Sequence, residues 1–245
     1  MNNKYIYQAI SKIDDDLIAE ADDTIKVAKT IKFKRVLVIA AAAILMLGIT
    51  VIAASIILGA REGHISTEPT YYNVPTVSEL NKDIGISVKV LEKYTNGYVF
   101  KSGHISDLTD YDTENNIIGN YKGLYCSYEK NGDTISLDID RGIFPELGSN
   151  EKVIDVYKNS EIRYVSYINK LVPGDYKPTE QDIIAEKSGK YALSYGVDEL
   201  KIIKVQVISW SYNGINYSIC ALDNDISSDE LAKMAKETID YQEES

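Results

Sequence analysis

An uninterrupted apolar stretch at residues 36–58 sets the first limit on how this chain folds. The stretch contains no charged residue and no Pro, Asn or Gln. At a rise of ~1.5 Å per residue, a helix of this length spans roughly 35 Å and crosses a hydrocarbon core of ~30 Å with some tilt. A buried helix of a soluble domain normally shows one polar stripe instead. The sequence therefore predicts one transmembrane helix over residues 36–58.

The charges that flank this stretch predict its orientation. Five basic residues and no acidic residue lie between positions 26 and 35, whereas Arg61 on the far side is followed at once by Glu62. Because cytoplasmic flanks carry the excess of Lys and Arg, residues 1–35 are expected in the cytoplasm and the rest of the chain outside it. A cleaved signal peptide is the alternative, but its charged region would be about 35 residues long and no clear A-x-A site follows.

The part after the stretch is acidic. Residues 59–245 carry 19 Lys and Arg against 31 Asp and Glu, whereas residues 1–35 carry seven against six. A strongly acidic domain repels nucleic acid and anionic polymers. We therefore expect no nucleic-acid partner.

The inner segment holds one apolar stripe, in which Ile6, Ile10, Ile13 and Leu17 recur at spacings of four, three and four. This spacing is typical of an amphipathic helix. A helix this short is marginal alone in water, so these four residues are expected to bind a cytoplasmic partner or a second copy of the chain. An unstructured tail beside the membrane is the alternative.

The outer part is expected to begin with a tether over residues 59–75, which contain two prolines and no periodic pattern. Residues 76–245 then predict an α+β domain with a mainly antiparallel sheet and a few short helices. Capping residues place helix starts after Thr76, Thr179 and Ser227. Runs rich in Tyr, Ile and Val predict strands over residues 85–94, 98–102, 123–129, 134–140, 161–168, 201–212 and 215–222.

Two β-hairpins are indicated by Asn131-Gly132 and Asn213-Gly214, each between alternating runs. Asn-Gly adopts the positive φ angles of a type I′ turn, whose twist matches the flanking strands. Asn96-Gly97 marks a third turn. The two hairpin segments also share several residues, which favours common hairpin chemistry, with an internal duplication as the alternative.

Cys126 and Cys220 are the two cysteines of the chain, and both fall in predicted strands. A lone Cys in a strand usually packs as a small hydrophobic residue. One disulfide between them is the alternative, since both are expected outside the cytoplasm.

Residue patterns typical of catalysis or of metal binding do not emerge. His64 lies in the expected tether and His104 in a loop-like K-S-G-H-I, and the common hydrolase, metalloprotease, redox and nucleotide motifs are missing from the sequence. Asp110, Asp112 and Glu114 alternate as at the start of a calcium loop, but the Gly and the final Glu of an EF-hand are replaced, which favours a solvated loop. We expect no enzyme, no cofactor and no metal. A glycosidase with paired carboxylates is the enzymatic alternative, but sequence gives no such geometry.

Several segments carry a resemblance to known proteins: residues 9–21, the basic stretch with its single apolar span, residues 97–140, and W-S-Y-N-G-I-N-Y-S-I followed by residues 228–239. Over most of its length the chain resembles uncharacterised single-pass membrane proteins of clostridia and related Gram-positive bacteria, described as anti-sigma-factor-like, with a C-terminal domain of unknown function. The resemblance implies that the inner segment binds an extracytoplasmic-function sigma factor. The zinc-binding anti-sigma pattern is not met, because residues 1–35 contain neither His nor Cys.

Two functional hypotheses follow. The first is a membrane-anchored regulatory protein that couples the outer domain to a cytoplasmic partner. The second is an envelope binding module for a glycan, peptide or protein, with the span serving only as an anchor. Seventeen of the 19 tyrosines lie outside the span and the inner segment. Such residues suit strands, and they also suit stacking on a ligand.

Overall fold

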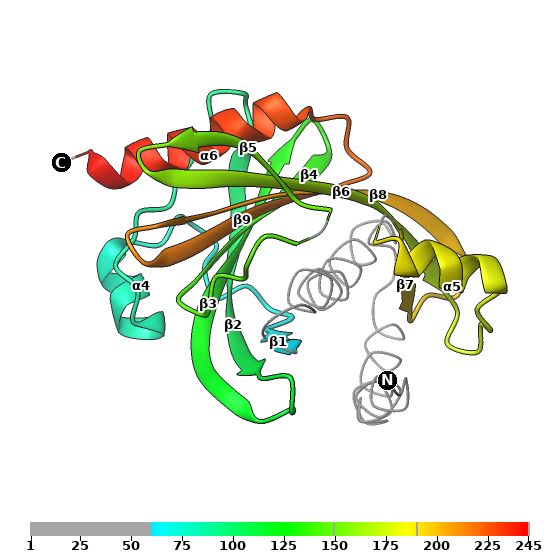
Figure 1. The fold of residues 1–245 in the computed structure, drawn as a ribbon. Coiled ribbons are helices and arrows are strands. Elements are labelled where there is room, and N and C mark those ends of the chain that lie inside the picture. The colour runs from blue at the N-terminus through cyan, green and yellow to red at the C-terminus, as the bar shows by residue number, and fades with distance from the viewer. Residues whose placement is uncertain (1–59, 149, 190, 245) are drawn as a thin grey trace, which may run out of the picture. The chain divides into compact units, whose positions relative to one another are not determined.

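The computed structural model describes residues 60–148, 150–189 and 191–244. Within these ranges the chain forms an α+β fold with a curled, mostly antiparallel sheet, in agreement with the class predicted from the sequence (Figure 1). The predicted inner segment, residues 1–35, and the predicted membrane helix, residues 36–58, lie outside the described residues. No helix within the described ranges is both long and apolar enough to cross a membrane.

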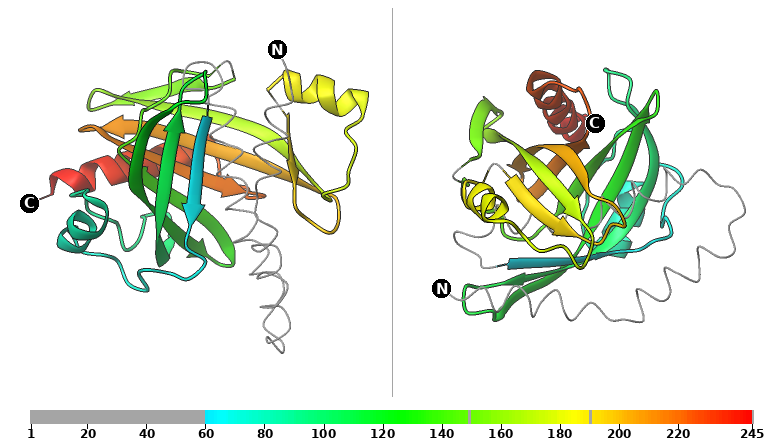
Figure 2. Two further views of the ribbon diagram at one scale, coloured as in Figure 1. Left: turned by 90° about the horizontal axis from the view of Figure 1, so that it is seen from below. Right: turned by 90° about the vertical axis from the view of Figure 1, so that its right-hand side faces the viewer.

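The described strands form a single sheet in the order β1-β2-β3-β4-β9-β8-β6-β5, and β7 pairs in parallel with the far half of β6 (Figures 1 and 2). The other pairs are antiparallel. The strands are β1 (Ala60–Ile65), β2 (Val99–Tyr111), β3 (Ile117–Lys130), β4 (Asp133–Asp140), β5 (Lys152–Tyr157), β6 (Ser160–Val172), β7 (Tyr191–Tyr195), β8 (Lys201–Tyr212) and β9 (Ile215–Leu222), and the helices are α4 (Val77–Ile84), α5 (Glu180–Lys187) and α6 (Ser228–Glu243).

The main hydrophobic core lies on one face of the sheet, which we call the first face. Alternate strand residues point to it because successive side chains of a strand face opposite sides. Helix α6 covers this face with an apolar stripe, and Trp210 stacks on its cross-strand partner Tyr217 at 5.3 Å. The largest fully buried side chains of this core are Trp210, Tyr94, Tyr128, Leu80, Ile86, Leu124, Ile135, Leu137, Ile139 and Ile162.

The three predicted helix starts are confirmed. Thr76, Thr179 and Ser227 each accept a backbone N–H with the side chain at the helix N-terminus, and the acidic residue three positions on completes a capping box. Gly85 ends α4 with a φ of 71°. These caps satisfy backbone donors that the helices leave free.

The two predicted Asn-Gly hairpin turns are confirmed. Asn131 and Gly132 have φ angles of 52° and 98°, and Asn213 and Gly214 have 52° and 73°. A third turn with two positive φ angles joins β5 to β6 at Lys158-Asn159, although no Asn-Gly pair is present there. At Asn96-Gly97 the chain also turns, but of the two residues Gly97 alone has positive φ.

The tether predicted over residues 59–75 is wrong where the structure describes it. Ala60–Ile65 form strand β1 against β2, and the buried Tyr71 exchanges backbone hydrogen bonds with Gly103 at 2.9 and 2.8 Å. The sequence does not indicate this strand because its residues, AREGHI, have low β-propensity. Its partner residues in β2, which lie forty to fifty positions farther along the chain, supply the pairing.

The strand predicted over residues 85–94 is also wrong, although its alternation is real. Ile86, Val88 and Val90 are buried in the main core. The backbone of Lys89, however, bonds through both its N–H and its carbonyl to the side-chain amide of Gln242 in α6, at 2.9 Å each. Packing on the core therefore produces a strand-like pattern in a segment that lies beside a helix.

The disulfide alternative is contradicted, because Cys126 and Cys220 are both free and buried. Strand β4 lies between them: Cys126 pairs with Leu137, and Cys220 pairs with Ser136. At ~4.8 Å per strand spacing the two Cα atoms lie roughly 10 Å apart, beyond the reach of a disulfide. The two thiols also point to opposite faces of the sheet, since Leu137 and Ser136 are neighbours in one strand.

Candidate functional site

The second face of the sheet, opposite the main core, carries a line of polar residues. Strand β4 has the pattern D-T-I-S-L-D-I-D, in which Ile135, Leu137 and Ile139 enter the core. Asp138 must therefore point to the second face. The strand registers place it in one line with five other polar side chains on adjacent strands, and we call this line the polar row: His104, Tyr125, Asp138, Ser218, Ser209 and Arg163.

Asp138 lies at the middle of the polar row and is half-buried. Burial raises the pKa of its carboxyl to about 8, and repulsion from the charge of Asp140 adds to the shift. The hydroxyl of Ser136, 3.5 Å away, acts weakly in the other direction. At neutral pH the carboxyl is therefore largely protonated, and it offers an O–H donor as well as an acceptor.

His104 and Tyr125 form the β2 end of the polar row. His104 was expected in a solvated loop, but it lies in β2 and is only 4% exposed. Its Nδ1 lies 2.8 Å from the carbonyl oxygen of Ser66, which can only accept, so Nδ1 carries the proton and Nε2 faces the Ser102 hydroxyl at 3.3 Å. Tyr125 packs edge-on against the imidazole, and burial raises the pKa of its hydroxyl. The hydrogen bonds of His104 and the ring contact with Tyr125 therefore hold both side chains in fixed orientations.

Two further polar residues on the second face lack partners. Within the described ranges, neither the hydroxyl of Tyr167 nor either polar atom of the Asn169 side chain meets a hydrogen-bond partner, although the residues are only 4% and 1% exposed. Val205, Val207 and Cys220 surround Tyr167 in a small apolar cluster. An unpaired buried polar group typically costs about 1–3 kcal/mol, so such groups mark places where a ligand or water can restore the bonds.

Residues 141–148, which follow β4, cross one end of this face, and we call them the strap. Gly142 accepts a hydrogen bond from Asn216 in β9 at 2.7 Å, and the carbonyl oxygen of Pro145 accepts one from Arg163 in β6 at 2.8 Å. The guanidinium of Arg163 also stacks on Phe144 at 4.6 Å. The strap therefore closes the Arg163 end of the polar row.

A second polar cluster, which we call the Arg61 clamp, joins β1 to the sheet. Arg61 donates to both carboxylate oxygens of Asp110 in β2, at 2.6 and 3.1 Å, and to Asp140 of β4 at 3.2 Å. Tyr121 of β3 donates to Asp110 at 3.0 Å, and its ring lies 5.3 Å from the guanidinium. The single guanidinium of Arg61 thus binds carboxylates from two strands, so the clamp fastens β1 to β2 and β4.

The acidic residues that alternate as in a calcium-binding loop have separate structural roles. Asp110 belongs to the Arg61 clamp and is buried, so the expectation of a solvated loop is wrong for this residue. Asp112 accepts backbone N–H groups of Glu114 and Asn116 at 2.9 and 2.8 Å and thereby shapes the β2–β3 turn. Among the residues described, no group of three His, Cys, Asp or Glu is placed to hold a metal ion.

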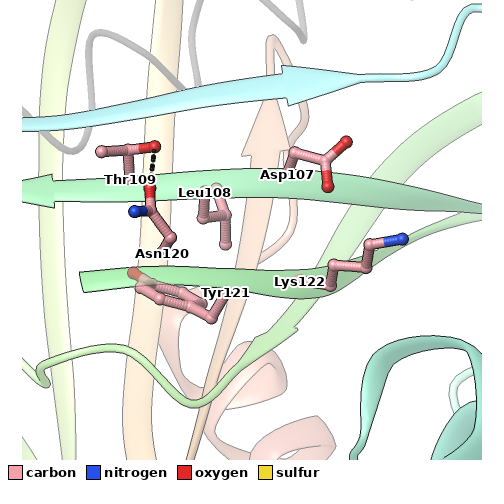
Figure 3. A pocket seen from close by; sticks show the side chains of 6 residues that line it. All are labelled: Asp107, Leu108, Thr109, Asn120, Tyr121 and Lys122. Carbon is pink, nitrogen blue, oxygen red and sulfur yellow. Dashed lines mark hydrogen bonds between the residues drawn. The ribbon is translucent and has the colours of Figure 1, made fainter.

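A shallow hollow of about 320 Å³ lies where β2 and β3 pass beyond the core (Figure 3). Its lining comes from two neighbouring strands only, and Thr109 and Asn120 bond to each other across it at 2.9 Å. Asp107 and Lys122 at its other end are exposed. The side chains do not converge on a common point, so the hollow offers little beyond what open sheet surface offers.

The four residues predicted to bind a cytoplasmic partner, Ile6, Ile10, Ile13 and Leu17, all lie outside the described residues. None of the polar row was singled out as a site from the sequence, although the alternation around Asp138 shows that the strand has a polar face. Comparison of the chain with models of known families, with curated proteins and with solved structures gave no match. The polar row thus places the largely protonated Asp138 among polar side chains of the second face, and the unpaired atoms of Tyr167 and Asn169 lie farther along β6 on the same face.

Proposed function

We propose that this chain is a membrane-anchored regulatory protein of the anti-sigma-factor-like kind. A single helix over residues 36–58 crosses the membrane, residues 1–35 hold a cytoplasmic partner, and the outer domain binds an envelope ligand on the polar row. The ligand is uncharged and rich in hydrogen-bonding groups, because the middle of the row is neutral at neutral pH.

The observation that carries this proposal is the position of β1. The strand begins at Ala60, two residues after the end of the predicted span, and the Arg61 clamp fastens it to β2 and β4. A simple anchor would tolerate a flexible tether at this point. A protein that passes a signal across the membrane needs the opposite, because slack between the span and the ligand-binding sheet would absorb any displacement.

The partner is tested by purification of the full-length protein in mild detergent. A sigma factor is expected to co-purify, and the double variant Ile10→Asp, Ile13→Asp is expected to lose it because both charges fall on the apolar stripe. The matched control is Asp14→Asn, Asp15→Asn, which changes charge beside the stripe and should keep the partner. If the unaltered chain recovers no cytoplasmic protein, the regulatory proposal is wrong.

The second candidate is an envelope binding module that uses the span only as an anchor. The unpaired atoms of Tyr167 and Asn169 favour it, since a bound ligand would supply the hydrogen-bond partners that these atoms lack. In that case a chain that lacks residues 2–35 but keeps the span and the outer domain should retain full function in cells. Loss of function in such a chain, with the outer domain still correctly exposed, would exclude this candidate.

A further inference from the structure

Three isoleucines are exposed together at one end of the domain. Ile117 and Ile118 begin strand β3 and are 58% and 44% exposed, and Ile143 in the strap is 44% exposed. Ile117 and Ile118 are successive residues of one strand and so face opposite sides of the sheet, which means that the two exposed side chains flank its end. Single exposed apolar residues need no explanation, but several large ones near one end of a sheet suit a contact made by that end.

The registers place this group beside the start of the domain. Ala60 pairs with Tyr111, and Tyr111 pairs with Ile117, so the three residues lie in one line across β1, β2 and β3. Ile143 is held at the same place, because its carbonyl accepts from Arg61 at 3.1 Å and its N–H donates to Asp110 at 3.3 Å.

The predicted membrane span ends close to this line. Leu58 precedes Ala60 by two residues, which cover roughly 7 Å at ~3.3 Å per residue of extended chain. The turn of the β2–β3 hairpin, residues 112–116, extends by a similar length beyond the line through Ala60, Tyr111 and Ile117. It does so on the side from which the chain enters β1, because β1 runs from Ala60 away from this turn. A span that ends at Leu58 would therefore leave the hydrocarbon layer within roughly 7 Å of this end of the sheet.

We infer that this end of the outer domain rests on the outer surface of the membrane, with Ile117, Ile118 and Ile143 in contact with lipid. The inference rests on the span of the proposed function and adds a second, peripheral contact to it. The lipid surface it suits is neutral or zwitterionic, since Asp112 and Glu114 in the turn would be repelled by anionic headgroups. Hydrogen bonds from Asn116 and then from Glu114 hold the pKa of Asp112 below its usual range, so this residue stays charged at the surface.

The test uses the full-length chain in phosphatidylcholine vesicles, with an environment-sensitive fluorophore on Ile118→Cys. Val156→Cys on β5 at the opposite edge of the sheet is the matched control, because Val156 is 62% exposed and equally apolar. We expect brominated lipid chains to quench the probe at position 118 and to leave the probe at position 156 unchanged. The unsubstituted chain should take no label, since both native thiols are buried.

A second probe on Ile143→Cys guards against misfolding of the hairpin variant and should be quenched as well. If the protein stays in the vesicles through an alkaline carbonate wash and neither probe is quenched, the surface contact is wrong and the membrane anchor stands. If the wash removes the protein, both the anchor and the contact are wrong. Equal quenching at positions 118 and 156 also overturns the inference, because contact would then not be confined to this end.

Discussion

Arg61 donates two parallel hydrogen bonds to the carboxylate of Asp110, from Nε at 2.6 Å and from Nη2 at 3.1 Å, and so joins the edge strand β1 to β2. The side chains are 14% and 2% exposed, respectively, so the pair is largely shielded from water. A paired guanidinium and carboxylate of this geometry is specific in orientation as well as attractive.

Substitution of Arg61 should release β1 selectively. Arg61→Ala leaves the carboxylate of Asp110 buried without its cation, which typically costs about 3–5 kcal/mol when a buried pair is broken. We expect amide hydrogen exchange in the full chain to accelerate first in β1, measured by mass spectrometry in detergent. Arg141→Ala, at an exposed arginine, is the control. Unchanged protection of β1 in Arg61→Ala would show that the clamp does not hold the strand.

The substitution Gly142→Ala should destabilise the fold. A Cβ at this position would overlap the Tyr121 hydroxyl and the Arg61 guanidinium, which Asp110 holds in place. Overpacking of this kind costs about 1–3 kcal/mol, and thermal unfolding should report it as a lower midpoint. Gly174→Ala is the control, since a Cβ there has open space around it. Equal midpoints for the two variants would contradict the packing described around Gly142.

The raised pKa of Asp138 predicts a pH dependence. The folded protein keeps a proton on this carboxyl up to about pH 8, whereas the unfolded chain releases it near pH 4, so folded molecules bind more protons between these values. Stability should therefore fall as pH rises from about 4 to 8, by at most about 1.4 kcal/mol per pH unit from this group. Asp138→Asn should flatten that slope in urea titrations at several pH values, and an unaltered slope would refute the assignment.

The unpaired amide of Asn169 should carry a cost in stability. Asn169→Leu replaces a buried group without partners by an apolar one of similar branching, and should stabilise the fold by about 1–3 kcal/mol. Thermal unfolding of the full chain measures this, with Asn169→Asp as the opposite case, which should lower the midpoint. A lower midpoint in Asn169→Leu would mean that the amide is paired in solution.

Both thiols should be free and unreactive in the folded protein. Burial raises the pKa of Cys126 and of Cys220, and Asp138 adds to the shift once its carboxyl ionises, so little thiolate forms at neutral pH. Alkylation followed by mass spectrometry should add no label to the native chain and two labels after denaturation without reductant. Failure to label the denatured chain would indicate the disulfide that the registers exclude.

The local chemistry of the fold was readable from the sequence. Asn131-Gly132 and Asn213-Gly214 specify their turns through φ angles that few other residues adopt, and Thr76 and Ser227 specify helix starts through hydrogen bonds within one turn. In each case the determining contacts lie within four residues. Lys158-Asn159 makes a similar turn without the favoured pair, because the strands on either side impose it.

The candidate site was not readable in the same way, because it depends on strand order. The pattern around Asp138 shows that one face of β4 is polar, and this much follows from the alternation alone. That Tyr125, Ser218 and Arg163 line up with Asp138 follows only from the pairing of β3, β4, β9, β8 and β6, in which Ser218 lies some eighty residues away along the chain. The polar face of β4 could be predicted from the sequence, but the residues that lie next to Asp138 on the adjacent strands could not.

The antiparallel register of β1 with β2 also decides how the domain would respond to force. A pull on Ala60 along the axis of β1 loads the strand lengthwise, so its backbone hydrogen bonds from the Ala60–Tyr111 pair to the Ile65–Ser106 pair share the tension and must slide together. Bonds that share a load yield at a much higher force than bonds that open one after another. The strand is thus mechanically stiff against a pull along its own axis, and it peels readily only when it is lifted sideways from the edge of the sheet.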